Sequence, residues 1–301
     1  MARGAAWHGR CYLPGMSHLT NNLKTAALMG GLTALLLVAS QLITGGSLPW
    51  LVGALVLACV MNVGGYFFSD KIAIAAMRAE EVGPGHDLHR IVAELCQTNG
   101  LPMPRVYVSP QPAPNAFATG RSPTHAAVCA TEGLLRMLDR EEVAGVMAHE
   151  LAHVKHRDIL IQCFATCIGA AISVLGYAFW FGGRSENSNP IGGLLILILG
   201  PLAAGLIQAA ISRQREFAAD REAALLLGDA RPLMTALQKI HHGNAQIPTD
   251  VNPAFNALMI AEPMNLMQGI GQLFSTHPPL EARLANLQQV GGGQQPGVRF
   301  A

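Results

Sequence analysis

Charged residues are scarce in this chain. They make up 13% of its 301 residues, whereas an average soluble protein has about 25%. Half of the residues are hydrophobic, and the mean hydropathy is +0.31. This composition excludes an ordinary soluble protein and indicates a membrane protein. The net charge is only +1 and no Lys/Arg stripe stands out, so we expect no nucleic acid as a partner.

Cysteine is also sparse, and its spacing does not suggest a metal site. Cys163 and Cys167 are four residues apart within an apolar run and have no histidine nearby, so we expect them to be small packing residues. The other cysteines show no zinc spacing; they are Cys11, Cys59, Cys96 and Cys129. A reducing, cytoplasmic setting would need no disulfide among them.

Long apolar runs, by contrast, are abundant. Four segments, near 25–43, 48–68, 159–181 and 191–211, are long enough to cross a bilayer core of roughly 30 Å. Only residues 44–47 clearly separate the first two, which predicts a tight hairpin. A short polar linker separates the second pair. The alternative for the second pair is a buried helical hairpin inside a soluble domain.

The positions of the basic residues predict the orientation in the membrane. Arg184 is the single Lys or Arg in the linker of the second pair, and the others lie before the first span or after the second and fourth. The positive-inside tendency therefore favours a cytoplasmic N-terminus and main domain. A cleaved signal peptide is the alternative for the first span, but the run is too long and another span follows almost at once.

These segments divide the chain into six parts. We expect an N-terminal extension (1–24, with Met16 as a possible start), a first transmembrane hairpin (25–68), the first half of a water-facing domain (69–158), a second hairpin (159–212), the second half of the domain (213–288) and a disordered tail (289–301). The second hairpin would bring the two halves of the domain together.

The run VMAHELAHVKH contains the pattern H-E-x-x-H at His149, Glu150 and His153. Helix positions four apart share a face, so the two imidazoles can bind one zinc ion. The intervening glutamate can polarise the metal-bound water. Asp139 and Glu142 resemble a capping pair that would begin the required helix. The alternative, an accidental match, has roughly a 2% chance from the His and Glu frequencies of the chain.

A catalytic zinc site needs a third protein ligand and an open position for water. We expect this ligand to be Glu216, because it begins the helical pattern E-F-A-A-D just after the fourth span. Asp220 lies one turn later and could orient a ligand imidazole. His156 is a weaker alternative, since three donors on one helix do not converge easily on one ion. A second alternative places Glu216 and Asp220 in a charged surface with neighbouring arginines.

The sequence PNAFATG suggests a substrate-binding strand. Several prolines precede it, so residues 115–119 are expected to form a short edge strand beside residues 126–131. An exposed edge can pair with an extended polypeptide without demanding particular side chains. The expected substrate contacts are Asn115, Ala116, Phe117 and Ala118. The alternative is an ordinary edge strand without a ligand.

Together these features resemble the HtpX-type membrane zinc metalloproteases, bacterial inner-membrane quality-control peptidases related to the CAAX prenyl proteases. The resemblance covers nearly the whole chain from Met16. The matching pieces are YFFSDK at 66–71, PNAFATG at 114–120, HELAHVKHRD at 149–158, REFAAD at 215–220 and FSTHPPLEARLANL at 274–287.

The resemblance implies a mainly α-helical, multi-pass membrane protein with four transmembrane helices and a cytoplasmic α+β zincin-like (gluzincin) protease domain. It implies one Zn²⁺ bound by His149, His153 and Glu216, with Glu150 as general base and Asp220 as the orienting carboxylate. His277 and Arg283 would stabilise the oxyanion formed from the scissile carbonyl. The alternative for His277 is a capping residue before the Pro-Pro start of a helix.

The expected function is zinc-dependent endopeptidase activity on polypeptides at the lipid bilayer. The resemblance implies that the substrates are misfolded or damaged membrane proteins and that the location is the bacterial inner membrane. One alternative is a CAAX-type prenyl-peptide protease, which is expected to have more spans and an enclosed chamber. Another is a non-catalytic membrane scaffold or chaperone, although the intact Glu150 argues against it. The sequence indicates no particular oligomeric state.

Overall fold

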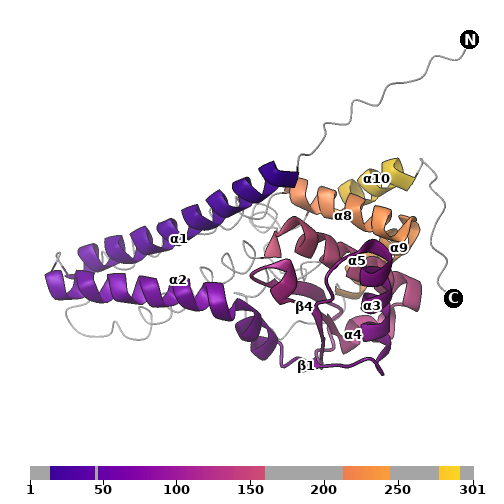
Figure 1. Cartoon of the computed structure of the whole chain (residues 1–301), viewed down its shortest axis with the longest axis horizontal. Coiled ribbons are helices and arrows are strands. Elements are labelled where there is room, and N and C mark those ends of the chain that lie inside the picture. The colour runs from indigo at the N-terminus through magenta and orange to yellow at the C-terminus, as the bar shows by residue number, and fades with distance from the viewer. Residues whose placement is uncertain (1–13, 45–46, 160–212, 245–277, 292–301) are drawn as a thin grey trace, which may run out of the picture.

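The computed structural model describes residues 14–44, 47–159, 213–244 and 278–291, which form a long helical hairpin joined to a mixed α/β domain (Figure 1). The elements are α1 (Pro14–Thr44), α2 (Leu48–Ala76), β1 (Glu80–Glu81), α3 (Asp87–Asn99), β2 (Arg105–Ser109), β3 (Ala116–Gly120), η1 (Pro123–His125), β4 (Ala126–Thr131), α4 (Glu132–Met137), α5 (Arg140–His156), α8 (Arg213–Leu227), α9 (Arg231–Asn244) and α10 (Leu280–Gly291).

Helices α1 and α2 form the hairpin expected from the first two apolar runs, and they lie side by side in Figure 1. The Asn62 amide donates hydrogen bonds to Thr33 Oγ1 at 3.0 Å and to the Met29 carbonyl oxygen at 3.3 Å. Helix α1 begins at Pro14, within the expected N-terminal extension. In the described ranges, α2 alone is long and apolar enough to cross a membrane, and α1 contains the shorter apolar stretch Thr25–Val38.

The predicted spans near 159–181 and 191–211 fall almost wholly outside the described residues. Helix α2 starts at Leu48, as expected, but continues beyond residue 68 to Ala76. The extension is stabilised by packing, because Ala73 and the following Met77 are buried in a small cluster with Phe117 of β3. The end of the hairpin therefore packs directly against the sheet.

The sheet has the strand order β1-β2-β4-β3. Strands β2 and β4 are parallel, whereas β1 pairs with β2 and β3 pairs with β4 in antiparallel register. The β3–β4 pair runs from Ala116 opposite Ala130 to Gly120 opposite Ala126. This confirms the two predicted strands. Strand β3 lies one residue later than the predicted 115–119, and β4 has the predicted bounds.

The expectation that this edge is exposed is wrong for the structure. Strand β3 is last in the sheet order, yet all its residues are buried, and so is Asn115. Helix α5 and the end of α2 pack against the strand. Because the residues of β3 are mostly small, these helices can approach it closely.

Helix α5 carries the H-E-x-x-H pattern, and it begins where the capping pair predicted. Asp139 accepts a hydrogen bond from the Glu142 amide at 2.9 Å, and the Glu142 carboxylate accepts one from the Asp139 amide at 3.0 Å. All residues from Glu142 to Val154 are buried. Helix α5 is enclosed on all sides by α3, α8, α9 and the sheet.

Helices α8 and α10 complete the domain beside α5. Helix α8 packs on α5, and α10 packs on α8 and α9. Pro278 and Pro279 precede α10, which continues to Gly291. The start of the expected disordered tail is therefore helical, because Val290 packs against the hydrophobic core and holds this last turn in place.

Candidate metal centre

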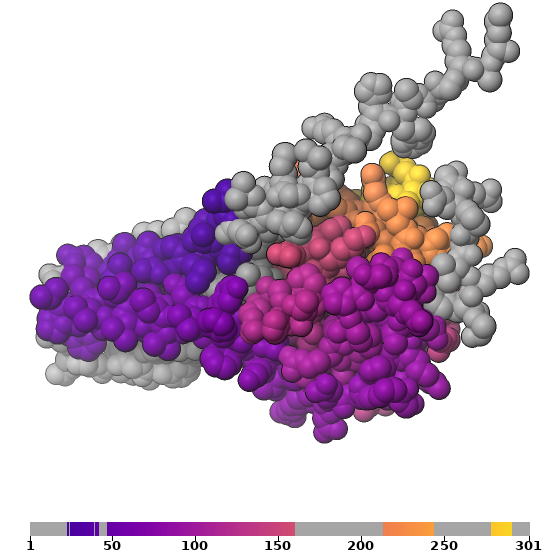
Figure 2. All heavy atoms as spheres, viewed as in Figure 1, coloured from indigo at the N-terminus to yellow at the C-terminus, as the bar shows by residue number. Residues whose placement is uncertain are grey.

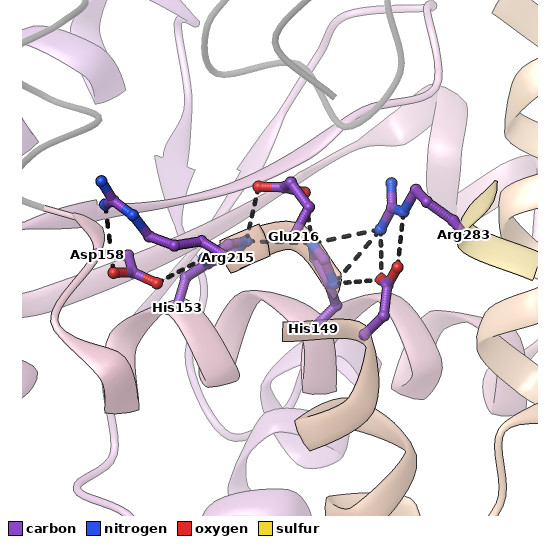
Figure 3. A network of polar contacts seen from close by, with 7 residues as sticks. His149, His153, Asp158, Arg215, Glu216 and Arg283 are labelled. Carbon is purple, nitrogen blue, oxygen red and sulfur yellow. Dashed lines mark hydrogen bonds and ion pairs between the residues drawn. The ribbon is translucent and has the colours of Figure 1, made fainter. Parts of the chain in front are cut away.

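Three potential metal ligands meet in the core of the domain. His149 and His153 come from consecutive turns of α5, and Glu216 comes from the first turn of α8 (Figure 3). The two imidazole Nε2 atoms are 3.2 Å apart. The Glu216 oxygens lie 3.5 Å from His149 Nε2 and 3.4 Å from His153 Nε2. All three side chains are buried.

These separations fit a tetrahedral zinc ion. Zinc bonds of about 2.0–2.1 Å at tetrahedral angles place neighbouring donor atoms about 3.3–3.4 Å apart. The Nε2–Nε2 spacing of 3.2 Å is close to that value, and each Glu216 oxygen lies at a similar distance from one imidazole, Oε2 3.5 Å from His149 and Oε1 3.4 Å from His153. Two imidazoles and one carboxylate also match the donor set of catalytic zinc sites that keep a fourth position open.

A carboxylate behind His149 is held in turn by an arginine. His149 Nδ1 lies 2.9 Å from Asp220 Oδ1. Arg283 of α10 binds Asp220 in a bidentate manner, with Nη2 2.6 Å from Oδ1 and Nε 2.9 Å from Oδ2. Because Nδ1 is engaged with Asp220, the Nε2 atom of His149 is the one directed at the ligand cluster.

Asp220, His149 and Arg283 change one another's pKa values through their contacts. Burial alone would raise the pKa of Asp220, but Arg283 and His149 outweigh it and lower that pKa to about 2. Burial would lower the pKa of His149, whereas its contacts with Asp220 and Glu216 raise it to about 9. Asp220 is thus ionised at neutral pH and is a strong acceptor for the imidazole.

The second histidine faces a different pair of residues, which sequence analysis missed. His153 Nδ1 forms no hydrogen bond within the described part of the chain, but it lies 3.5 Å from Asp158 Oδ2. The other oxygen of Asp158 is 3.4 Å from Arg215 Nη1 (Figure 3). Arg215 immediately precedes Glu216, so this contact joins the end of α5 to the ligand-bearing turn of α8.

The local backbone explains how Asp158 reaches its place. Arg157 caps α5 in the left-handed region with φ 59°, which costs a non-glycine residue roughly 1–2 kcal/mol. The turn brings the chain back, and the Asp158 amide donates to the His153 carbonyl oxygen at 3.0 Å. The sequence signal was the aspartate at the end of HELAHVKHRD, just beyond the predicted helix.

The remaining candidates occupy distinct positions. Glu150 is buried beside His149 on α5, and its charge acts on Arg283. His156 is 32% exposed and lies 3.9 Å from Glu222, outside the ligand cluster. The alternative of a charged surface is wrong, since Glu216 and Asp220 are at most 1% exposed. Predicted residue His277 lies outside the described residues.

A buried His₂Glu set, with an H-E-x-x-H helix supplying the histidines and a second helix the glutamate, is the arrangement of a metallopeptidase. Comparison with known proteins agrees. The sequence profile of Peptidase family M48 matches residues 84–290. The "Protease HtpX homolog" of Syntrophotalea carbinolica is 50% identical over 281 residues, covering 90% of this chain and 99% of that protein. That of Burkholderia ambifaria is 49% identical over 279 residues, covering 90% and 97%.

The chain therefore belongs to peptidase family M48 and, within it, to the HtpX-type proteases. It is a metalloprotease. Among solved structures, the crystal structure of S. mikatae Ste24p is similar with a TM-score of 0.48 and 19% identity, over 91% of this chain and 66% of that one. That likeness is too distant to add to the assignment.

Proposed function

We propose that this metalloprotease is a zinc-dependent endopeptidase of the bacterial inner membrane that cleaves misfolded or damaged membrane proteins on the cytoplasmic side. The observation that carries the chemistry is the buried cluster of His149, His153 and Glu216, whose potential ligand atoms all lie within 4.8 Å of one another and whose types match a catalytic zinc site. The apolar helix α2, directly connected to the protease domain, supports the membrane location.

Zinc, when bound, supplies a lowered pKa for a coordinated water and polarisation of the scissile carbonyl. Glu150 accepts a proton from the attacking water at its carboxylate and delivers it to the leaving amine nitrogen. His277 and Arg283 are the proposed donors to the carbonyl oxygen as negative charge develops on it. Arg283 has a further positioning role, because its Nε and Nη2 groups hold Asp220.

Each ligand histidine has its own positioning pair. Asp220, held by Arg283, lies 2.9 Å from His149 Nδ1, whereas Asp158, held by Arg215, faces His153 Nδ1 at 3.5 Å without a hydrogen bond in the described part of the chain. The two pairs differ in strength, because the contacts of Asp220 are 2.6–2.9 Å long and those of Asp158 are 3.4–3.5 Å.

Replacing either aspartate by asparagine should therefore weaken metal binding without removing a ligand. Loss of a carboxylate that orients a ligand histidine, without itself binding the metal, typically lowers metal affinity about 10–100-fold. We expect the loss of metal affinity to be near the upper end of this range for Asp220→Asn and near the lower end for Asp158→Asn. Competition with a chromophoric chelator measures the affinity, and the visible spectrum of the cobalt-loaded protein reports the ligand geometry.

Asp229→Asn is the matched control, because Asp229 pairs with the exposed Arg231 away from the cluster. It should leave both affinity and cobalt spectrum unchanged. An Asp158→Asn protein that binds metal as tightly as the parent, with the same spectrum, would show that Asp158 does not position His153.

We further propose that β3 binds the substrate backbone through residues 115–118. Strand β3 ends the sheet order and packs against α5, so a strand added to it would run beside the helix that carries Glu150. Since Asn115, Ala116, Phe117 and Ala118 are buried, binding requires this edge to open. Backbone pairing would suit a protease that accepts many sequences.

The substrate class can be tested with the full-length protein in liposomes. We expect a membrane protein with a destabilised cytoplasmic domain to be cut there, and its stable parent to be spared. Chelation should stop cleavage and added zinc should restore it. Preferential cleavage of a farnesylated CAAX peptide would favour a prenyl-peptide protease instead. Zinc binding without cleavage of any substrate would favour the scaffold alternative.

A further inference from the structure

The end of the apolar part of α2 carries an exposed group of aromatic and basic side chains. Phe67 and Phe68 are each 49% exposed. Lys71 Nζ lies 5.4 Å from the centre of the Phe68 ring, and Arg121 Cζ lies 5.5 Å from that of Phe67. We call these four residues the headgroup band. Nothing in the proteolytic mechanism uses them.

The position of the band along α2 matches a membrane surface. Trp50, 65% exposed, marks the other end of the apolar stretch. At 1.5 Å per residue, Trp50 and Phe67 are separated by about 25 Å along the helix, close to a hydrocarbon core of roughly 30 Å. Aromatic side chains gather at both interfaces of transmembrane helices. The side chains exposed between them are apolar: Val52, Leu55, Val56, Leu57, Val60 and Val63.

The polar side chain within this stretch turns inward instead. Asn62 is buried against α1 through its hydrogen bonds to Thr33 and Met29. Figure 2 shows the two helices of the hairpin projecting from the domain with one long face open along their length. If α2 crosses the membrane, as the proposed function requires, the headgroup band lies at the level of the lipid headgroups.

In the described ranges, neither Lys71 nor Arg121 forms an ion pair. Asp70, which precedes Lys71 in the chain, is paired with Arg105, with its Oδ2 atom 2.5 Å from Arg105 Nη2. Two positive charges therefore lie beside two phenylalanine rings without a carboxylate partner among the described residues.

One of these charges is brought to the membrane helix by the sheet. Arg121 follows Gly120, the last residue of β3, whose φ is +126°. A Cβ at Gly120 would lie 2.2 Å from the His125 carbonyl oxygen, so the tight turn requires glycine. This turn directs Arg121 toward Phe67 of α2. The band thus joins the end of β3 to the membrane helix.

We propose that the headgroup band binds the phosphate of an anionic phospholipid. The phenylalanine rings enter the acyl boundary, and the two long basic side chains reach outward to the phosphate. An anionic membrane surface attracts each nearby Lys or Arg strongly enough to change affinity about fivefold. Lipid bound here would fix the depth of α2 in the membrane and hold the β3 turn at its surface.

Native mass spectrometry of the full-length protein in mixed micelles tests the proposal by counting bound phosphatidylglycerol and phosphatidylcholine. The wild type should retain phosphatidylglycerol preferentially. Lys71→Gln and Arg121→Gln should each lower its affinity about fivefold, and the double variant about 30-fold. Arg231→Gln is the matched control, because Arg231 is 86% exposed on α9, far from the hairpin in Figure 1.

Three results would overturn the proposal. The first is retention of phosphatidylglycerol by the double variant at the wild-type level, and the second is displacement of the lipid by inorganic phosphate at equal concentration. Release of the protein from membranes by alkaline carbonate would reject the membrane location itself, and with it part of the proposed function. Zinc-dependent cleavage of a soluble unfolded polypeptide by the double variant, at the wild-type rate, would show that the protease domain remains intact.

Discussion

Glu150→Gln should reduce proteolysis by about 10²–10⁴-fold, the usual contribution of a general acid–base group, and leave metal content unchanged. Glu150 shares a buried helical turn with His149, but it is not among the clustered donors. Glutamine preserves the side-chain volume and removes the carboxylate that would accept the proton. The measurement is the initial cleavage rate of the full-length protein in micelles, alongside its zinc content.

Glu142→Gln provides a control on the same helix. Glu142 is also buried on α5, but it belongs to the capping box and pairs with Lys239 rather than with the ligands. This change should lower stability while the folded protein keeps its cleavage rate per bound zinc. Equal cleavage by wild type and a folded, zinc-loaded Glu150→Gln protein would reject Glu150 as the base.

Sequence patterns predicted the local features of the site well, because these depend on short-range geometry. The Asp139–Glu142 capping box needs only three residues of spacing, and the structure contains it. The His149–His153 pair follows from four-residue helical spacing. The pairing of β3 with β4 was also foreseeable, since the two strands are close in sequence and separated by turn residues.

Features that depend on distant parts of the chain were harder to predict. Neither the enclosure of α5 on all sides nor the burial of β3 follows from a local pattern, because both result from tertiary packing. Asp158 was missed for a related reason. Its role depends on a left-handed Arg157, a conformation more typical of glycine or asparagine, and on Arg215 far along the chain.

The candidate site is assembled by three helices that are distant in sequence. Helix α5 supplies the two imidazoles, α8 supplies Glu216 and Asp220, and α10 supplies Arg283. The Asp158–Arg215 and Asp220–Arg283 contacts lie at opposite ends of this cluster (Figure 3). Each links a ligand histidine to charged groups of another helix, so the metal geometry depends on how α8 and α10 pack against α5.

Glu216→Ala should lower metal binding more than Asp220→Asn or Asp158→Asn does. It removes one of three protein donors, so the fall in zinc affinity should exceed the about 10–100-fold expected for an orienting carboxylate. Proteolysis should disappear with the metal. Glu216→Gln keeps the side-chain volume and serves if the alanine protein unfolds, because a neutral amide is a poor ligand for zinc.

Glu222→Ala is the matched control on the same helix. It removes a carboxylate that is not among the clustered metal ligands. Glu222 binds Lys155 outside the cluster, so its removal should leave zinc affinity at the wild-type value. Chelator competition gives the affinities, and thermal unfolding in excess chelator confirms that each variant folds without metal. If Glu216→Ala and Glu216→Gln both retained zinc as tightly as Glu222→Ala, α8 would contribute no ligand. A metal bound by α5 alone would then lack the carboxylate that completes the tetrahedral donor set, and the proposed chemistry would fail with it.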